Sequence, residues 1–356
     1  MPRVGTTHRG GMPAPFSAAT QSDQSRYAAV ILAGGEGVRL SSFTRKVFGY
    51  HLPKQFCPLF EGETLLQRTM RRTSIVVPPE QTITVFTRAH ERFFGPMLDG
   101  SASSSILIQP ENRGTATAIL GALLRLIEDG HTGPVAIFPS DHYVSNDLTF
   151  MRHVSAALCA VEHAPQLKIL LGIAPDGPET EYGWIESGGP VAAMHPALGQ
   201  INQVRHFWEK PSPEIALNLY NRKCLWNSFI LVANALNLLL LIAKALPDLY
   251  SEFTRIESFT DTASKEEALR TIFADLPAAD FSTSVLTEFP EEFSVLPVTG
   301  VSWSDLGDPR RLLAAISNDG GRISGGRQNV TQIKSFAIAG LGSEQINRYK
   351  TSQGWQ

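Results

Sequence analysis

The stretch LAGGEGVRL at residues 32–40 follows directly on the apolar run YAAVI at residues 27–31. A buried strand that ends in glycines leaves backbone N–H groups free to approach phosphate oxygens, because glycine has no side chain to hold a ligand away. Arg39 adds a permanent charge whose planar fork suits phosphate. The sequence therefore predicts phosphate chemistry at the end of the first strand.

Composition places the chain among folded globular proteins. Its 356 residues, 43% of them apolar and 18% charged, suffice for one large α/β domain, or a domain with a smaller appendage. The net charge of −3 gives no basic field of the kind that nucleic-acid binders use, so we expect no nucleic-acid partner. The longest apolar stretch, residues 229–245, is interrupted by asparagine and lysine, so we expect no membrane span. The three cysteines lack metal-type spacing, and no signal-peptide core is visible, which favours a cytoplasmic protein.

Strand-like and helix-like patterns alternate along the first half of the chain. Such alternation predicts an α/β fold with a mostly parallel, Rossmann-like sheet and helices on both faces. Ligands of such sheets lie beyond the carboxyl ends of the strands, where the glycine loop and the segment Ser140-Asp141-His142 are both expected. The predicted strands are 28–32, 82–87, 105–109, 135–138 and 167–172, and the predicted helices are 63–72, 115–128 and 147–162.

From about residue 176 the pattern changes, and we expect the sheet to continue with a subregion that closes over a second substrate. Residues 1–26 are interpreted as a disordered leader, and residues 318–356 as a tail in which 336–339 could form a short strand. Between them lies one domain, 27–317, divided at about 175. The predicted strands of its second half are 183–187, 203–209 and 224–232, and the predicted helices are 235–246 and 266–273.

Three kinds of phosphate-binding loop compete for the opening stretch. A P-loop requires lysine at the position that Arg39 occupies. A dinucleotide fingerprint, GxGxxG, would place its third glycine at Leu40, which weakens that interpretation. A glycine-rich surface turn is the ordinary alternative. The GG-x-G-x-RL loop of sugar-nucleotide pyrophosphorylases matches at each defining position, which are Gly34, Gly35, Gly37, Arg39 and Leu40.

Eight short motifs resemble, in order, those of the sugar-1-phosphate nucleotidyltransferase family, and most of all the mannose-1-phosphate guanylyltransferases. The resemblance covers about residues 27–315. It implies a glycosyltransferase-A-like fold with a nucleotide half at about 27–175 and a sugar-phosphate half at about 176–317. The motifs are LAGGEGVRL at 32–40, PKQF at 53–56, QPENRGTATAI at 109–119, FPSDH at 138–142, TEYGWIE at 180–186, FWEKP at 207–211, LWNS at 225–228 and WSDLGDPRRL at 303–312.

The resemblance implies that a sugar 1-phosphate oxygen attacks the α-phosphorus of a nucleoside triphosphate while pyrophosphate leaves. Repulsion between the two polyanions costs about 4 kcal/mol for each close pair of unit charges at an effective dielectric of about 20. We therefore expect Mg²⁺ and basic residues to do the catalysis, without a covalent intermediate. Asp141 and Asp305 match the family's metal carboxylates, although alone each would be an ordinary cap or turn residue.

The same resemblance assigns the cations and the nucleotide contacts. Arg39 is assigned to the departing β- and γ-phosphates and Lys54 to the reacting phosphates. The N1–H and N2–H₂ donors of guanine could be accepted by Glu111 or by a backbone carbonyl, and Thr115 could instead simply begin the next helix. The residues expected to bind the nucleotide are Leu32, Ala33, Gly34, Gly35, Gly37, Gln109, Glu111, Gly114 and Thr115.

For the sugar phosphate, the resemblance assigns Lys210 to the phosphate, and Glu209 and Asn227 to hydroxyl groups. Gly183 would let backbone approach the sugar. A solvated Glu–Lys pair and a turn asparagine are the ordinary alternatives. The expected reaction joins GTP and mannose 1-phosphate into GDP-mannose; the alternatives are another sugar phosphate or nucleotide, or a non-catalytic nucleotide-sugar-binding homologue. A homo-oligomer is left open.

Two segments depart from the family pattern. Residues 41–52 are longer than usual and add Arg45, Lys46 and His51, which could hold triphosphate or form a mobile lid. Phe229 stands where the family's Asn-Ser-Gly has glycine, so the sugar contact is expected to differ there. His142 is given no acid–base role, and the tryptophans at 184, 208 and 226 are expected to be walls and core.

Overall fold

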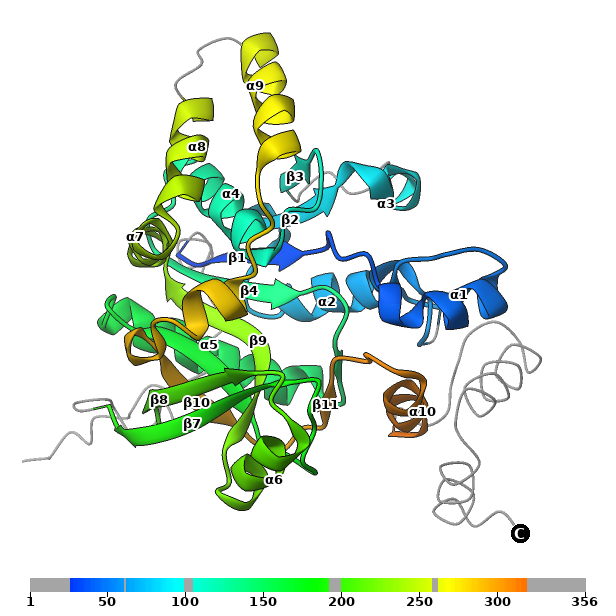
Figure 1. Ribbon diagram of the computed structural model, residues 1–356, viewed down its shortest axis with the longest axis vertical. Helices are drawn as coiled ribbons and strands as arrows, with labels where there is room; N and C mark the ends of the chain where they lie inside the picture. The colour runs from blue at the N-terminus through cyan, green and yellow to red at the C-terminus, as the bar shows by residue number, and fades with distance from the viewer. Residues whose placement is uncertain (1–25, 61, 99–104, 192–199, 258–261, 319–356) are drawn as a thin grey trace, which may run out of the picture.

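β1 (Ala28–Leu32) is the centre of the parallel part of a nine-stranded sheet whose order is β3-β2-β1-β4-β9-β6-β10-β8-β7. This computed structural model describes residues 26–60, 62–98, 105–191, 200–257 and 262–318. β1 is parallel to β2 (Thr82–Thr87) and to β4 (Pro134–Pro139), and β2 is parallel to β3 (Ser105–Gln109). The predicted α/β fold with a Rossmann-like sheet is confirmed (Figure 1).

Successive residues of β1 point into two separate cores, which is why the whole strand reads as apolar. Ala29 and Ile31 belong to the core that α2 (Leu65–Thr73) and α5 (Asp147–His163) cover. Ala28 and Val30 belong to the opposite core, beneath α4 (Thr115–Glu128) and α7 (Ala235–Ala245). A parallel strand that is buried on both faces is expected to be continuously hydrophobic. Helices therefore cover both faces of the sheet, as predicted (Figure 1).

The second half continues the same sheet, also as predicted, but mostly with antiparallel strands. β9 (Leu225–Asn234) lies antiparallel between β4 and β6 (Lys168–Ile173). β10 (Ser294–Val298) is parallel to β6 and antiparallel to β8 (Asn202–Glu209), and β8 pairs with β7 (Gly183–Pro190). Because β9 pairs with β4 of the first half, the two halves share one backbone hydrogen-bond network.

A separate two-stranded ribbon connects distant parts of the chain. β5 (Tyr143–Val144) pairs antiparallel with β11 (Trp303–Ser304), in the register Trp303↔Val144 and Ser304↔Tyr143. This pairing brings the residue after β11, Asp305, beside the turn that precedes β5. The ribbon was not predicted, and it decides where the second candidate carboxylate lies.

The insertion at 41–52 contains α1 (Ser41–Phe48), with Phe43 buried, and Gly49 at φ 82 ends it. The ring of Tyr50 stacks on Phe93, which attaches the insertion to the body of the protein. The leader, the tail and the strand suggested at 336–339 lie outside the described residues, apart from residues 26 and 318. The remaining helices, which were not predicted apart from the one at 266–273, are α3 (Glu91–Leu98), α6 (Pro213–Asn221), α8 (Pro247–Glu257), α9 (Thr262–Asp275) and α10 (Pro309–Asn318). Within the described ranges, no helix has the length and apolar character needed to traverse a bilayer.

Candidate active site

The glycine loop is fixed from below by a buried amide. Gln55, only 1% exposed, donates through Nε2 to the carbonyl oxygens of Ala33 at 3.0 Å and Gly35 at 2.8 Å. Gly37 has φ 62, and a Cβ there would lie 2.8 Å from the backbone nitrogen of Lys54. Only glycine tolerates both conditions. The loop and the lysine segment are therefore packed as one unit.

The loop forms one wall of a pocket of about 400 Å³ beyond the carboxyl ends of the parallel strands. The structure thus brings the glycine loop and the Ser140–His142 turn to one edge, as the sequence predicted. Seven of the predicted nucleotide and catalytic residues line this pocket, namely Leu32, Gly34, Gly35, Gln109, Gly114, Thr115 and Asp141. The further lining residues, which sequence reasoning gave no role in binding, are Gln55, Asn112, Ala118, Pro139, Ser140, His142, Phe229 and Asp280.

The two candidate metal carboxylates meet around one buried ammonium group. Lys54, 6% exposed, places Nζ 2.9 Å from Oδ2 of Asp141. The same nitrogen donates a hydrogen bond to the backbone carbonyl oxygen of Asp305. Lys54 is therefore the link between two aspartates that are 164 positions apart in the chain.

The carboxylate of Asp305 is held by two arginines. Its Oδ2 accepts from Nη2 of Arg39 at 3.1 Å, and its Oδ1 accepts from Nη1 of Arg311 at 2.7 Å. The backbone N–H of Gly307 donates to Oδ1 at 2.8 Å. A Cβ at Gly307 would lie within 2.9 Å of both guanidinium groups and 2.7 Å from Oδ2, so glycine keeps this cluster open.

Electrostatics keep both carboxylates ionised. Burial alone would raise the pKa of Asp141, but the neighbouring Lys54 and His142 outweigh it and the net pKa lies below the ordinary value. Asp305 behaves the same way, with Lys54 and Arg311 as the cations that outweigh burial and keep its pKa low. Burial lowers the pKa of His142 to about 4, so its ring is neutral at pH 7.

The donor set of this junction suits a hard divalent cation. Mg²⁺ prefers oxygen ligands and is commonly bound by one or two carboxylates together with substrate phosphates. Asp141 and Asp305 are ionised and already attract a cation, the Lys54 ammonium group. Among the described residues, no group of three or more His, Cys, Asp or Glu side chains could hold a metal ion alone. The two aspartates therefore fit Mg²⁺ only as a site that phosphates complete.

The predicted sugar-phosphate residues gather where β7, β8 and β9 pair. A Cβ at Gly183 would lie 3.1 Å from Oε2 of Glu209 and 3.3 Å from Cβ of Asn227. The ammonium group of Lys210 lies 3.4 Å from Oε1 of Glu209. Burial raises the pKa of Glu209, partly offset by Lys210. The cluster therefore presents carboxyl, amide and ammonium groups over a small glycine surface.

Phe229 adopts the conformation of the glycine that it replaces in the family pattern. Its φ is 59, in the left-handed region that costs a non-glycine residue about 1 kcal/mol or more. The backbone N–H of Phe229 donates to Oδ1 of Asn227 at 3.0 Å, which holds that amide in place. Because Phe229 also lines the 400 Å³ pocket, the sugar cluster and the nucleotide pocket are continuous.

Several predicted residues lie elsewhere. Glu111 pairs with Arg113 at 2.6 Å and does not line the pocket. Ala33 is fully buried, and its backbone N–H donates to Val85 as an extension of the strand. Arg45, Lys46 and His51 of the insertion are also not among the lining residues. Arg311 had been given no role, although it lies in the quoted WSDLGDPRRL motif.

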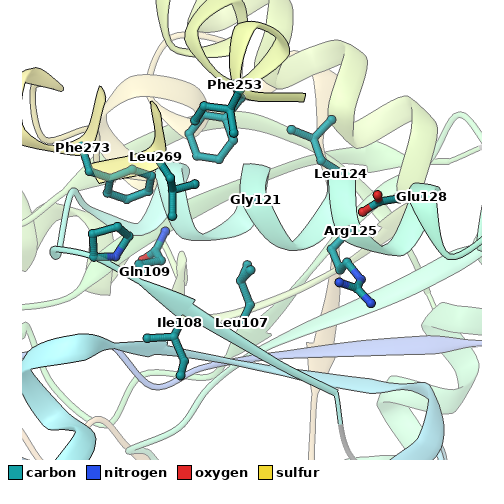
Figure 2. A pocket seen from close by; sticks show the side chains of 12 residues that line it. Leu107, Ile108, Gln109, Gly121, Leu124, Arg125, Glu128, Phe253, Leu269 and Phe273 are labelled. Atoms are coloured by element: carbon teal, nitrogen blue, oxygen red, sulfur yellow. The ribbon is translucent and has the colours of Figure 1, made fainter. Parts of the chain in front are cut away.

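Gln109 separates the nucleotide pocket from a second cavity of about 140 Å³ (Figure 2). Figure 2 shows Gln109 at one end of this cavity and the charged pair Arg125 and Glu128 at the other. Gln109 is 4% exposed, and its Nε2 has no hydrogen-bond partner in the part of the chain that the structure describes. The other lining residues are largely apolar and include Leu107, Leu124, Phe253, Leu269 and Phe273.

Comparison with known proteins gives concordant results. A sequence profile of nucleotidyl transferases matches residues 28–320. The chain is 30% identical to the xanthan biosynthesis protein XanB of Xanthomonas campestris pv. campestris (strain B100), over 82% of this chain and 60% of that protein. It is 29% identical, with the same two coverages, to an Escherichia coli protein named mannose-1-phosphate guanylyltransferase. The chain thus spans 60% of the length of these curated relatives.

One solved structure is similar over most of its length. It is described as mannose-1-phosphate geranyltransferase from Thermus thermophilus, and the superposition has a TM-score of 0.70 at 29% sequence identity. The match covers 82% of this chain and 79% of that chain. The likeness therefore extends over both halves of the fold described above.

Proposed function

The chain belongs to the nucleotidyl transferase family, and on that premise we propose that it transfers a guanylyl group from GTP to mannose 1-phosphate, forming GDP-mannose and pyrophosphate. One observation carries the proposal: Lys54 links Asp141 and Asp305 at the rim where the glycine loop ends. Two ionised carboxylates and several cations at one rim match a reaction between two polyanions. A module that only binds nucleotide sugars has no need of that pair.

In this proposal the backbone N–H groups of the glycine loop receive phosphate oxygens, and the buried Gln55 keeps the loop from moving. Lys54 is already desolvated, so its charge is poorly screened and is directed at the reacting phosphates. The side chain of Arg39 is 50% exposed, so its fork is accessible to the β- and γ-phosphates. Binding in one orientation lowers the entropic part of the barrier.

Asp141 and Asp305 would hold Mg²⁺, which when bound supplies positive charge against the phosphate oxygens. The chain's own residues do the remaining work. Asn227 and Glu209 accept and donate hydrogen bonds to sugar hydroxyls, and Lys210 neutralises the sugar phosphate. The names of the two curated relatives and the solved structure support mannose 1-phosphate as the acceptor and the guanylyl group as the unit transferred.

The test is pyrophosphate release across a matrix of nucleoside triphosphates and sugar 1-phosphates, with and without Mg²⁺. We expect turnover with GTP and mannose 1-phosphate that requires the metal. Asp141→Asn should lower kcat by about 10²-fold or more, whereas Asp129→Asn, at the exposed end of α4, should leave it unchanged. The absence of pyrophosphate release with every pair would reject the enzyme in favour of a binding protein. Turnover with a different pair would keep the chemistry and change the substrates.

A further inference from the structure

Asp280 lies in the nucleotide pocket but belongs to no motif that the family resemblance provided. The segment around it is fastened to the start of α4 by backbone hydrogen bonds. Ala279 receives the N–H of Ala116 at 3.0 Å and donates its own N–H to Arg113 at 2.9 Å. Gly114 has φ 87, and a Cβ there would lie 2.2 Å from the Ala279 carbonyl oxygen. Asp280 is therefore presented on rigid backbone.

The Asp280 carboxylate is oriented by two threonines. Thr115 donates from Oγ1 to Oδ2 at 2.9 Å, and the same hydroxyl accepts the N–H of Phe281 at 2.8 Å. The backbone N–H of Thr283 donates to Oδ1 at 3.1 Å. An ionised carboxylate offers about four acceptor positions, so these bonds leave acceptor capacity unused. No cation pairs with this carboxylate among the described residues, and the side chain is exposed at the pocket.

A bare carboxylate in this pocket constrains what can lie next to it. It repels phosphate groups, so its partner is an uncharged donor of the ligand. Guanine carries N1–H and N2–H₂ side by side, a donor pair that matches the two oxygens of a carboxylate, and adenine has no such pair on that edge. Glu111 cannot serve in its observed position, because Arg113 holds it outside the pocket.

We propose that Asp280 reads the N1–H and N2–H₂ edge of guanine and thereby selects GTP. The inference rests on the proposed function. Ribose hydroxyls are also uncharged donors, so the experiment separates the base from the ribose. Gln109 lines the same pocket with an unpartnered Nε2, which is a donor available to a base oxygen.

The experiment is calorimetric titration of the full chain, with Mg²⁺ present, against GTP, ITP, N1-methyl-GTP, 2′-deoxy-GTP, UTP and ATP. ITP lacks the N2 amine, and the methylated analogue lacks N1–H. We expect the wild type to bind GTP about tenfold or more tightly than ITP, N1-methyl-GTP or ATP, because a site built for a donor rejects analogues that lack it. Asp280→Asn should lose most of this preference while its response to 2′-deoxy-GTP stays that of the wild type.

The matched control is Asp275→Asn, an aspartate in the same segment that lies outside the pocket and should retain the wild-type preference. The inference is overturned if Asp280→Asn keeps the preference for GTP, or if it loses discrimination against 2′-deoxy-GTP instead. The wild type alone also decides the matter, since equal affinity for GTP and N1-methyl-GTP overturns the inference even when no variant folds. Binding of GTP without pyrophosphate release would reject the proposed function and leave this inference standing.

Discussion

Replacing Lys54 by methionine tests whether the ammonium group is what lets two carboxylates share one buried rim. Methionine has a similar length and fills the same space without the charge. The variant leaves Asp141 without its 2.9 Å partner, and leaves the carbonyl oxygen of Asp305 without its donor. We expect the variant to fold, to be less stable than the wild type, and to depend on Mg²⁺ for part of its stability.

The size of the loss follows from the geometry. Two unit charges 2.9 Å apart interact by about 6 kcal/mol at an effective dielectric of about 20. The Lys54 side chain is 7% exposed, but that of Asp141 is 29% exposed, and water therefore weakens the pair. Removing one partner of a buried pair costs about 3–5 kcal/mol. We expect a loss of about 3 kcal/mol, at the lower end of that range because of the exposure of Asp141.

The assay is urea unfolding of both proteins at pH 7 with EDTA and again with millimolar Mg²⁺. Mg²⁺ should stabilise the variant more than the wild type, because the two carboxylates then lack their resident cation. Lys46→Met is the control, since Lys46 is exposed on α1, and a surface change of this kind costs less than about 0.5 kcal/mol. A loss below about 1 kcal/mol, or equal stabilisation of both proteins by Mg²⁺, would refute the reasoning.

Two glycines of α4 and its start should respond oppositely to alanine. Gly121→Ala should raise the free energy of unfolding by about 0.5 kcal/mol, because the new methyl group meets side chains at 3.3–3.4 Å that border an open cavity; urea unfolding that shows a loss would contradict this. Gly114→Ala should lower it by about 2 kcal/mol or more, since its φ is 87 and the methyl group collides with the Ala279 backbone; an unchanged unfolding midpoint would contradict this. Burial raises the pKa of Glu292, but hydrogen bonds from two lysine ammonium groups outweigh it and hold the pKa below its ordinary value of 4.5. This carboxylate therefore stabilises the fold above pH 4.5, and Glu292→Gln should be less stable than the wild type by up to about 1 kcal/mol at pH 7, with the difference vanishing as the pH falls through the lowered pKa; a gap that persists in acid would contradict the assignment.

Most of the parallel half could be read from the sequence because local pattern and burial agree there. The strand Thr82–Thr87 and the helix Thr115–Glu128 were predicted to the residue. In both, apolar residues recur with the period of the element, and glycine or proline lies close to at least one boundary. The missed helix α6 (Pro213–Asn221) did carry a signal, because Ser212 caps it and proline is its first residue.

Other elements left no readable local signal. The helix α1 (Ser41–Phe48) is half polar, and its helical state depends on burying Phe43 and on Gly49 at its end. The strands β5 and β11 have two residues each, too few for any periodic pattern. Their pairing spans about 160 residues of sequence, so only the folded chain shows that Asp305 lies beside the Asp141 turn.

Motif spacing predicted which residue types gather at the site, but not which partners they have. Glu111 was expected to meet the base because it lies in a nucleotide motif, yet its contact with Arg113 depends on a segment far away, whose carbonyl oxygens at Phe273 and Ala274 hold that arginine. Asp280 had no motif to mark it. Such pairings depend on tertiary distances, which a linear pattern does not contain.

The cations of the site fall into two groups that differ in how easily they change partners. Lys54 and Arg311 are largely buried and pair with buried acids, so separating them would leave uncompensated charge in a low-dielectric environment. Arg39 instead pairs with Glu181 at 3.2 Å and with Asp305 at 3.1 Å, and both Arg39 and Glu181 are 50% exposed. An exposed pair is worth about 0–1 kcal/mol, so a triphosphate can take Arg39 from Glu181 at little cost. Because Arg311 still neutralises Asp305 after that exchange, the protein can release one cation to its substrate without leaving a buried aspartate unpaired.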